Sequence, residues 1–346
     1  MFDFFRPFIF KFSPEIAHSL AIKALKLNNF PINKIVKSEI LQTNFCGKKL
    51  SSPIGVAAGF DKNAEVYNPL FNLGFGFVEV GTITPKPQYG NPKPRVFRLE
   101  EDEALINRLG FNNSGSEEIS SRISKETKKG VIGINIGPNK DSENRIEDYV
   151  NCFNKFHSLA DYITINISSP NTENLRDFHN QDELNSLVKE LKNEKKKLNS
   201  KIPIAVKVSP DLNDEQIEIV SNILLDQEIE IIIVSNSSDK NRDKLNNINK
   251  LEKGGLSGKP LYEISNNIIS KFYKLLGNKI KIIGVGGVDS GEAAFEKIIR
   301  GASLVQLYTG MVYKGPDIAS SISSELIDIL KNKGFKNISE AVGTKY

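Results

Sequence analysis

The chain has 346 residues, of which 39% are hydrophobic, and it carries a formal net charge of +4. This length suits one α/β domain of roughly 250 residues with an appendage, and because the basic residues are dispersed among acidic ones, no nucleic-acid partner is expected. Two distant cysteines, Cys46 and Cys152, and three scattered histidines show no metal-ligand or hydrolase spacing, so no metal site is predicted.

The first thirty residues combine an aromatic segment with a predicted amphipathic helix. Residues 1–12 contain six phenylalanines, and a helix is predicted from Pro14, with Ser13 as its N-cap and its end at Pro31. Its polar face includes Glu15. Its apolar face is expected to contain Ile16, Ala17, Leu20, Ala21, Ala24 and Leu25. The helix alone is more typical of packing on its own domain, but the aromatic segment shifts the balance toward a surface that lies in a membrane interface.

From Pro53 onward, short β-branched runs alternate with amphipathic stretches. Strands are predicted to begin at Ile54, Phe75, Val131, Tyr162, Ile204, Ile231, Lys281 and Ser303. Helices are predicted to begin near Asn63, Asp182, Asp214, Leu261, Ser290 and Asp317. Eight βα units predict an α/β fold of the (β/α)8 TIM-barrel type with a small N-terminal helical extension, and they place the active site at the carboxyl ends of the strands.

Polar residues and glycines concentrate at these predicted strand ends, although turns and helix caps explain each of them individually. Two long segments, 83–113 and 236–260, also follow strands on this side. Because barrel loops are usually short, we expect these two segments to cover the site.

The segment GVGGVDSGEAA, which joins the seventh strand to its helix, brings backbone N–H groups close to a phosphate at a helix N-terminus. Asp289 replaces the third glycine of a dinucleotide motif, and the segment lies late in the barrel, so a mononucleotide such as FMN fits better than NAD. Lys207, at the end of an apolar strand, is suited to stabilising negative charge on a reduced flavin, although a structural ion pair is equally typical of a single lysine.

The segment NISSPNT (166–172) places Ser169 between Asn166 and Asn171. Serine is a poor base in water, so proton abstraction by Ser169 requires a sequestered site and an acidified substrate proton. The amide side chains suit a neutral, imide-like ring, and Lys62 can neutralise a carboxylate.

Eight segments together resemble the dihydroorotate dehydrogenase family. They are AAGFDKN (57–63), EVGTITPKPQYGNPKPRVFRL (79–99), INRLGFNN (106–113), GINIGPNKD (133–141), INISSPNT (165–172), GGLSGKPL (254–261), IIGVGGVDS (282–290) and GASLVQLYTG (301–310). The resemblance runs in order along nearly the whole chain. It implies oxidation of (S)-dihydroorotate to orotate in de novo pyrimidine (UMP) biosynthesis, with one FMN per chain.

The resemblance also implies roles for individual residues. Ser169 would take the C5 proton of dihydroorotate while hydride passes from C6 to the flavin. FMN would be held by Ala57, Ala58, Gly59, Phe60, Asp61, Thr82, Asn135, Asn166, Lys207, Ser235, Gly258, Gly287, Tyr308 and Thr309. The substrate would be held by Lys62, Asn107, Arg108, Leu109, Gly110, Phe111, Asn166, Asn171, Asn236 and Ser237.

The resemblance further indicates the quinone-linked class of the family. Soluble members use cysteine as the base, where this chain has Ser169, and they lack the N-terminal extension. Residues 1–40 would form a quinone tunnel lined by His18, Arg98 and Tyr308, and residues 41–346 would form the FMN-binding barrel. Residues 1–30 would attach the protein peripherally to the cytoplasmic face of the cell membrane, which is the inner membrane if the source is bacterial.

Two alternatives compete with this interpretation. Another FMN-dependent barrel oxidoreductase, such as a tRNA dihydrouridine synthase, would require a basic RNA-binding face and a cysteine in the site. A non-catalytic barrel protein on a membrane surface would have no need of Lys62, Asn107, Ser169 and Lys207 together.

Overall fold

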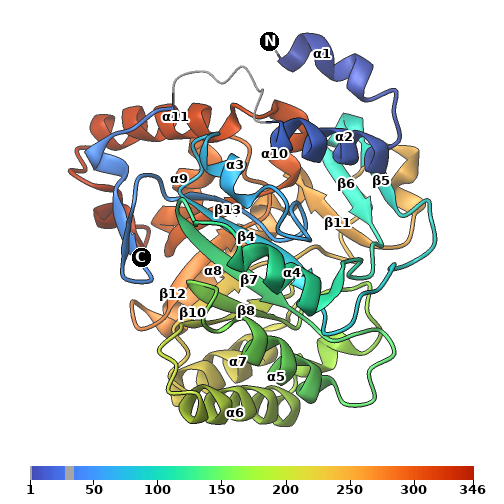
Figure 1. Ribbon diagram of the computed structural model, residues 1–346. Coiled ribbons are helices and arrows are strands. Elements are labelled where there is room, and N and C mark those ends of the chain that lie inside the picture. Colours follow the sequence, from blue (N-terminus) through green and yellow to red (C-terminus); the bar gives the residue numbers. More distant parts are fainter. Residues whose placement is uncertain (1, 28–34) are drawn as a thin grey trace.

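The computed structural model describes residues 2–27 and 35–346, and a closed barrel of eight parallel strands forms its centre (Figure 1). In the order in which they are hydrogen-bonded, the strands are β10 (Ile231–Val234), β12 (Lys281–Val285), β13 (Ala302–Leu307), β3 (Ile54–Val56), β4 (Phe77–Ile83), β7 (Val131–Ile136), β8 (Tyr162–Asn166) and β9 (Ile204–Val208). Their β-branched runs are buried on both faces, as is typical of parallel strands that helices cover. The predicted TIM barrel is therefore confirmed.

Helices surround the barrel. They are α3 (Tyr67–Phe71), α4 (Gly115–Ser124), α5 (Arg145–Phe156), α6 (Gln181–Lys197), α7 (Asp214–Asp226), α8 (Tyr262–Leu276), α9 (Gly291–Ile299), α10 (Thr309–Lys314) and α11 (Ile318–Asn332). Each long helix buries one stripe; in α5 the stripe is Tyr149, Cys152, Phe153 and Phe156. Short 3-10 helices span Glu39–Leu41, Glu100–Asp102, Leu175–His179, Ile248–Leu251, Lys259–Leu261 and Ile338–Ala341.

Two antiparallel elements were not predicted. A hairpin of β1 (Thr43–Phe45) and β2 (Lys48–Leu50) packs Phe45 and Leu50 against the barrel interior. The long segments contain β5 (Val96–Leu99), β6 (Ala104–Asn107) and β11 (Gly255–Gly258), which pair as one sheet in the order β11-β6-β5. This sheet encloses a small core of its own and carries Asn107 toward the site. The two segments are therefore a folded cover, not open loops.

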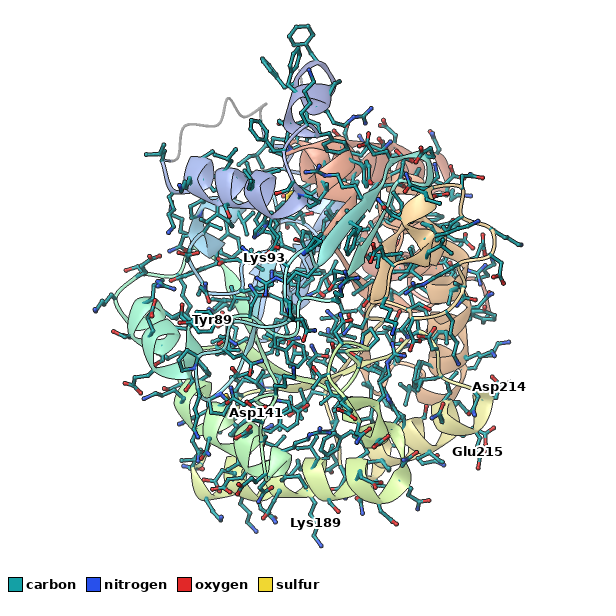
Figure 2. All side chains as sticks on the ribbon, turned by 90° about the vertical axis from the view of Figure 1, so that its right-hand side faces the viewer. Tyr89, Lys93, Asp141, Lys189, Asp214 and Glu215 are labelled. Carbon is teal, nitrogen blue, oxygen red and sulfur yellow. The ribbon has the colours of Figure 1, made fainter. Side chains whose placement is uncertain are left out.

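The N-terminal extension consists of α1 (Phe2–Ile9) and α2 (Pro14–Lys26), which lie beside β5 and α10 (Figure 1). Figure 2 shows this extension at the opposite end of the molecule from Lys189, Asp214 and Glu215. The described residues contain no helix that is long and apolar enough to cross a membrane. The predicted helix is confirmed from Pro14 to Lys26, whereas the predicted end at Pro31 lies outside the described residues.

The residues of the predicted apolar face of α2 do not all point the same way. Ile16 is 53% and Leu20 is 47% exposed, as a surface in a membrane interface requires, whereas Leu25 is buried. The stripe that faces the barrel is Glu15, His18, Ile22 and Leu25. Hydrophobic periodicity misses this stripe because two of its four members are polar: Glu15 pairs with Arg95 of the cover, and His18 packs against Phe60 and Tyr308.

Candidate active site

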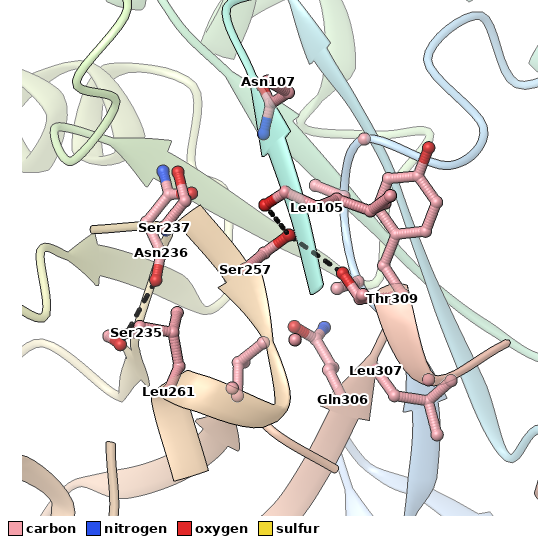
Figure 3. Close-up of a pocket in the computed structure, with 18 of the residues that line it drawn as sticks. Leu105, Asn107, Ser235, Asn236, Ser237, Ser257, Leu261, Gln306, Leu307 and Thr309 are labelled. Carbon is pink, nitrogen blue, oxygen red and sulfur yellow. Dashed lines mark hydrogen bonds between the residues drawn. The ribbon is translucent and has the colours of Figure 1, made fainter. Parts of the chain in front are cut away.

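One pocket opens at the carboxyl ends of the barrel strands, between the barrel and the antiparallel cover. Figure 3 shows Asn236 and Ser237 on one side of this pocket, with Gln306 and Thr309 on the other. The predicted site residues that line it are Ala57, Ala58, Gly59, Lys62, Thr82, Asn107, Leu109, Gly110, Phe111, Asn166, Ser169, Asn171, Lys207, Ser235, Asn236, Ser237, Gly258, Gly287, Tyr308 and Thr309. Barrel topology thus gathers these residues from segments throughout the chain.

Three predicted cofactor residues do not line the pocket. The buried Asp61 carboxylate accepts the backbone N–H groups of Glu65 at 2.7 Å and Val66 at 2.8 Å, and burial raises the pKa of Asp61 to about 6. Asp61 therefore fixes the turn that carries Lys62. Asn135 lies one layer below the pocket and accepts a hydrogen bond from Thr82 at 2.6 Å. The ring of Phe60 packs against His18 and Tyr308, at the side of the pocket.

Arg108 is the predicted substrate residue that lies outside the pocket. Its guanidinium pairs with Glu252 at 2.6 Å and lies 4.5 Å above the ring of Phe97. These contacts tie the loop after β6 to the segment before β11. Arg108 therefore strengthens the cover, and its charge is directed away from the pocket.

Ser169 lies just after β8 and is only 6% exposed. Its Oγ accepts the backbone N–H of Asn171 at 3.2 Å. Within residues 2–27 and 35–346, neither a histidine nor a carboxylate is hydrogen-bonded to this oxygen. The sequestration that a serine base requires is present, and partial charge from the Asn171 amide supports negative charge on Oγ.

Amide side chains from several elements meet near Ser169. Asn171 donates from Nδ2 to the backbone oxygen of Asn107 at 3.0 Å and to its Oδ1 at 3.3 Å. Asn236 donates from Nδ2 to Oγ of Ser168 at 2.8 Å and accepts the backbone N–H of Ser237 at 2.8 Å. Amides present both donors and acceptors, which suits a ring with adjacent N–H and C=O groups.

Lys62 supplies a positive charge at the same pocket. Its Nζ donates to the backbone oxygen of Gly59 at 2.6 Å. Burial and, secondarily, the Arg95 charge lower the pKa of Lys62 to about 8. The ammonium therefore remains largely protonated near pH 7, where it can bind a carboxylate.

Two buried polar groups in the pocket wall have no protein partner. Lys207 is 4% exposed, and in the described part of the chain its Nζ has neither a hydrogen bond nor an ion pair. Burial lowers the pKa of Lys207, while the charge of Glu79 raises it. Oε1 of Gln306 is also buried without a partner. Since buried polar groups are normally hydrogen-bonded, these two atoms fit a bound polar ring.

A glycine loop follows β12 and lines the pocket. Gly286 and Gly287 have φ of +115° and +69°, and a Cβ on Gly287 would lie 2.7 Å from Tyr262, so only glycine fits there. The expected helix terminus is not free, because Glu325 accepts the backbone N–H of Gly291, the first residue of α9. A phosphate would therefore meet the glycine loop rather than the end of α9.

Comparison with known proteins agrees with this geometry. The sequence model of the family described as dihydroorotate dehydrogenase matches residues 40–330. The chain is 46% identical over 340 residues to the dihydroorotate dehydrogenase (quinone) of Bartonella tribocorum, covering 97% of this chain and 94% of that one. It is 44% identical over 334 residues to the protein of the same name from Agrobacterium fabrum, covering 95% and 92%. The chain belongs to the dihydroorotate dehydrogenase family.

A solved structure supports the same assignment. The dihydroorotate dehydrogenase of Eimeria tenella, crystallised with ferulenol, superposes with a TM-score of 0.93 at 37% identity and covers 96% of this chain and 95% of that one. The similarity to known family members therefore covers both the barrel and most of the N-terminal extension. The polar pocket is the candidate active site of a dihydroorotate dehydrogenase.

Of the three predicted quinone-tunnel residues, His18 and Tyr308 are in ring contact, and the described residues show no direct contact between Arg98 and either of them. The His18 ring lies 5.2 Å from Phe60 and 6.4 Å from Tyr308, between centroids, so α2 reaches the edge of the pocket. Burial, with a smaller effect of Lys62, lowers the pKa of His18 to about 3, so its ring is neutral. Arg98 instead donates to the backbone oxygens of Phe10 at 3.1 Å and Phe12 at 2.8 Å, and it holds the extension onto β5.

Three residues in and below the pocket were not predicted from the sequence: Glu79, Gln306 and Ser257. Ser257 lies within 2.9 Å of the Thr309 hydroxyl and donates to the Leu105 oxygen at 3.4 Å (Figure 3). Glu79 and Gln306 gave a signal, because each interrupts an apolar run, FGFVEVG and SLVQLY respectively. Such a residue in a barrel strand indicates a polar group buried in the lumen.

Proposed function

We propose that this protein oxidises (S)-dihydroorotate to orotate, uses FMN as its prosthetic group and passes the electrons to a membrane quinone, as a step of de novo pyrimidine biosynthesis. The observation that carries the proposal is the meeting of Ser169, Lys62 and the unpartnered Lys207 in one pocket. The family membership and the quinone-linked names of the relatives support it.

The pocket fits FMN. Lys207 and the oxygen of Gln306 supply a buried cation and a buried acceptor for the flavin ring, and the loop at Gly286 and Gly287 supplies bare backbone for the phosphate. When bound, FMN accepts the hydride of the oxidation. The further contacts that we assign to it come from Ala57, Ala58, Gly59, Thr82, Asn166, Ser235, Gly258, Tyr308 and Thr309.

A small set of residues would bind, orient and deprotonate the substrate. Lys62 binds the carboxylate of dihydroorotate, and the amides of Asn107, Asn171 and Asn236 orient the ring through its N–H and C=O groups. Ser169 takes the C5 proton at Oγ. The antiparallel cover excludes water, which preserves the basicity of Oγ and strengthens every charge contact.

The extension would connect this pocket to the membrane. The described helices α1 and α2 expose apolar side chains, and His18 on α2 reaches Phe60 and Tyr308 at the edge of the pocket. We assign quinone access to residues 1–40, catalysis to residues 41–346, and the location of the protein to the cytoplasmic face of the cell membrane, bound peripherally.

Spectroscopy of the purified protein tests this function. The protein is expected to be yellow, to be bleached by dihydroorotate without oxygen, and to recover its colour on addition of a quinone but not of fumarate or NAD. Colourless protein that takes up no added FMN would contradict the flavin. Recovery with fumarate would contradict the quinone-linked class.

A further inference from the structure

A carboxylate lies in the barrel lumen, one layer below the pocket. Glu79 on β4 is fully buried, and its Oε1 accepts a hydrogen bond from Nδ2 of Asn135 at 2.8 Å. Its Oε2 accepts from Tyr162 OH at 3.0 Å, Thr164 Oγ1 at 3.2 Å and Gln306 Nε2 at 3.1 Å. Four donors from β7, β8 and β13 thus surround this side chain, which offsets the cost of burying its charge.

The contact to Asn135 is the end of a longer chain of hydrogen bonds that reaches the substrate side of the pocket. Every donor in it points toward Glu79. The bonds run from Asn236 to Ser168 at 2.8 Å, Ser168 to Asn166 at 2.8 Å, Asn166 to Thr82 at 2.9 Å, Thr82 to Asn135 at 2.6 Å and Asn135 to Glu79 at 2.8 Å.

The carboxylate determines this direction. Because an ionised carboxylate only accepts hydrogen bonds, Asn135 must turn its NH2 group toward Glu79 and its oxygen toward Thr82. The Thr82 hydroxyl must then donate downward and accept from Asn166, whose oxygen faces Ser168 and Asn236. Three of these residues, Thr82, Asn166 and Asn236, line the pocket.

The same carboxylate acts on the buried cation. Lys207 is paired in register with Asn166 in the ladder between β8 and β9, and it has no bonded partner among the described residues. Burial lowers the pKa of Lys207, and the negative charge of Glu79 opposes that effect. Thr164, which donates to Glu79, lies two residues before Asn166 on the same face of β8, so the Glu79 carboxylate lies one layer below Lys207 and favours its protonated form.

We propose that Glu79 is a positioning residue of this active site: its carboxylate fixes the orientation of the amide chain from Asn135 to Asn236 and supplies the negative charge that faces Lys207. This role rests on the proposed FMN-dependent function. A neutral amide cannot replace the carboxylate, because it has one acceptor oxygen, and its own NH2 would meet the donors of Asn135 or Gln306.

The test compares Glu79→Gln with Tyr162→Phe. Both lose contacts at the same buried point, but Tyr162→Phe keeps the charge and the chain. For each protein, apoprotein would be titrated with FMN, and the midpoint potential of the bound flavin would be measured by dye equilibration. Glu79→Gln is expected to bind oxidised FMN about tenfold more weakly and the reduced form a further tenfold more weakly. That additional tenfold corresponds to a fall in potential of about 30 mV for a two-electron couple.

Tyr162→Phe is expected to match the wild type in both measurements. A Glu79→Gln protein that is folded by circular dichroism and has wild-type FMN affinity and potential would overturn the proposal. If wild-type protein binds no FMN, the proposed function fails instead, so the two failures are distinguishable.

A second variant covers the case in which Glu79→Gln does not fold. Asn135→Leu breaks the chain but leaves Glu79 with three donors and its charge. It is expected to weaken both redox forms of FMN about tenfold with an unchanged potential. Wild-type affinity in Asn135→Leu would overturn the positioning role, and a changed potential would overturn the assignment of the charge effect to Glu79.

Discussion

Ser169, which we propose as the base, is distinguished by its burial rather than by a neighbouring histidine or carboxylate. We expect Ser169→Ala to lower the rate of flavin reduction by dihydroorotate by about 10² to 10⁴, because the variant loses the group that accepts the C5 proton. FMN absorbance should be unchanged. Stopped-flow bleaching under anaerobic conditions measures this rate. Ser169→Cys, which keeps an ionisable group, should retain a larger part of it, and an alanine variant with ordinary rates would exclude the role.

If Lys62 binds the substrate carboxylate, as we propose, substrate affinity should depend on pH in an unusual range. An ordinary lysine titrates near pH 10.4, but the pKa of Lys62 is lowered to about 8 by burial. The cation is present below pH 8 and is lost as pH rises through that value, so kcat/KM for dihydroorotate should fall above about pH 8. Lys62→Met should bind weakly with no such inflection. A wild-type profile that is flat to pH 9.5 would contradict the assignment.

At the level of single residues, sequence reasoning found the rim of the pocket but not the layer below it. Asn107, Ser169 and Lys207 stand at strand ends, where barrel topology makes them converge. Glu79 and Gln306 lie inside strands, and only the closed lumen shows that they meet. Asp61 resembled its neighbours in sequence, yet its carboxylate turns away to bind two backbone amides.

Among the elements, α2 depends on one partly buried ion pair. Glu15 lies 2.9 Å from the guanidinium of the buried Arg95, and its removal would leave that cation without its carboxylate. Glu15→Gln should lower the free energy of unfolding by about 1–2 kcal/mol, between the values for exposed and buried pairs. Amides of residues 14–26 should also exchange hydrogen faster.

The exposed pair of Lys26 and Glu65, at 2.7 Å, provides the matched control on the same helix. Lys26→Gln should change the free energy of unfolding by at most about 0.5 kcal/mol, because water screens this pair. Urea unfolding of both variants measures the difference. Equal effects would show that the contact of Glu15 with Arg95 does not hold α2 in place.

The same helix shows which elements a sequence can predict. All eight barrel strands follow from β-branched runs, because parallel strands that are buried on both faces are rich in apolar, β-branched residues. The inward face of α2 does not follow, since Glu15 and His18 face the barrel through specific partners. The sheet of β5, β6 and β11 was not predicted because its strands are short and lie among prolines and glycines, and because β11 pairs with β6 across about 150 residues of sequence.

At the scale of the whole molecule, several large exposed apolar side chains lie together on the N-terminal extension. Phe4 is 71% and Phe8 is 56% exposed, and Phe5, Phe12, Ile16 and Leu20 on the same extension are each about half exposed. Large exposed apolar surfaces mark partners or membranes. This surface lies on the extension whose inner side, through His18, contacts Phe60 and Tyr308 at the pocket.

A vesicle-binding experiment tests whether this surface meets lipid. Phe4→Ser with Phe8→Ser should weaken co-sedimentation with anionic vesicles at least about tenfold, because each ring loses apolar area that the interface would bury. Leu198→Ser supplies the control: Leu198 is 36% exposed and follows α6, which Figure 1 shows at the opposite end of the molecule. Reduction of a water-soluble quinone should remain near wild type in both proteins, since neither change touches the pocket. If the two variants bind vesicles equally well, the membrane contact lies elsewhere. The exposed phenylalanines would then be a binding surface for a protein partner.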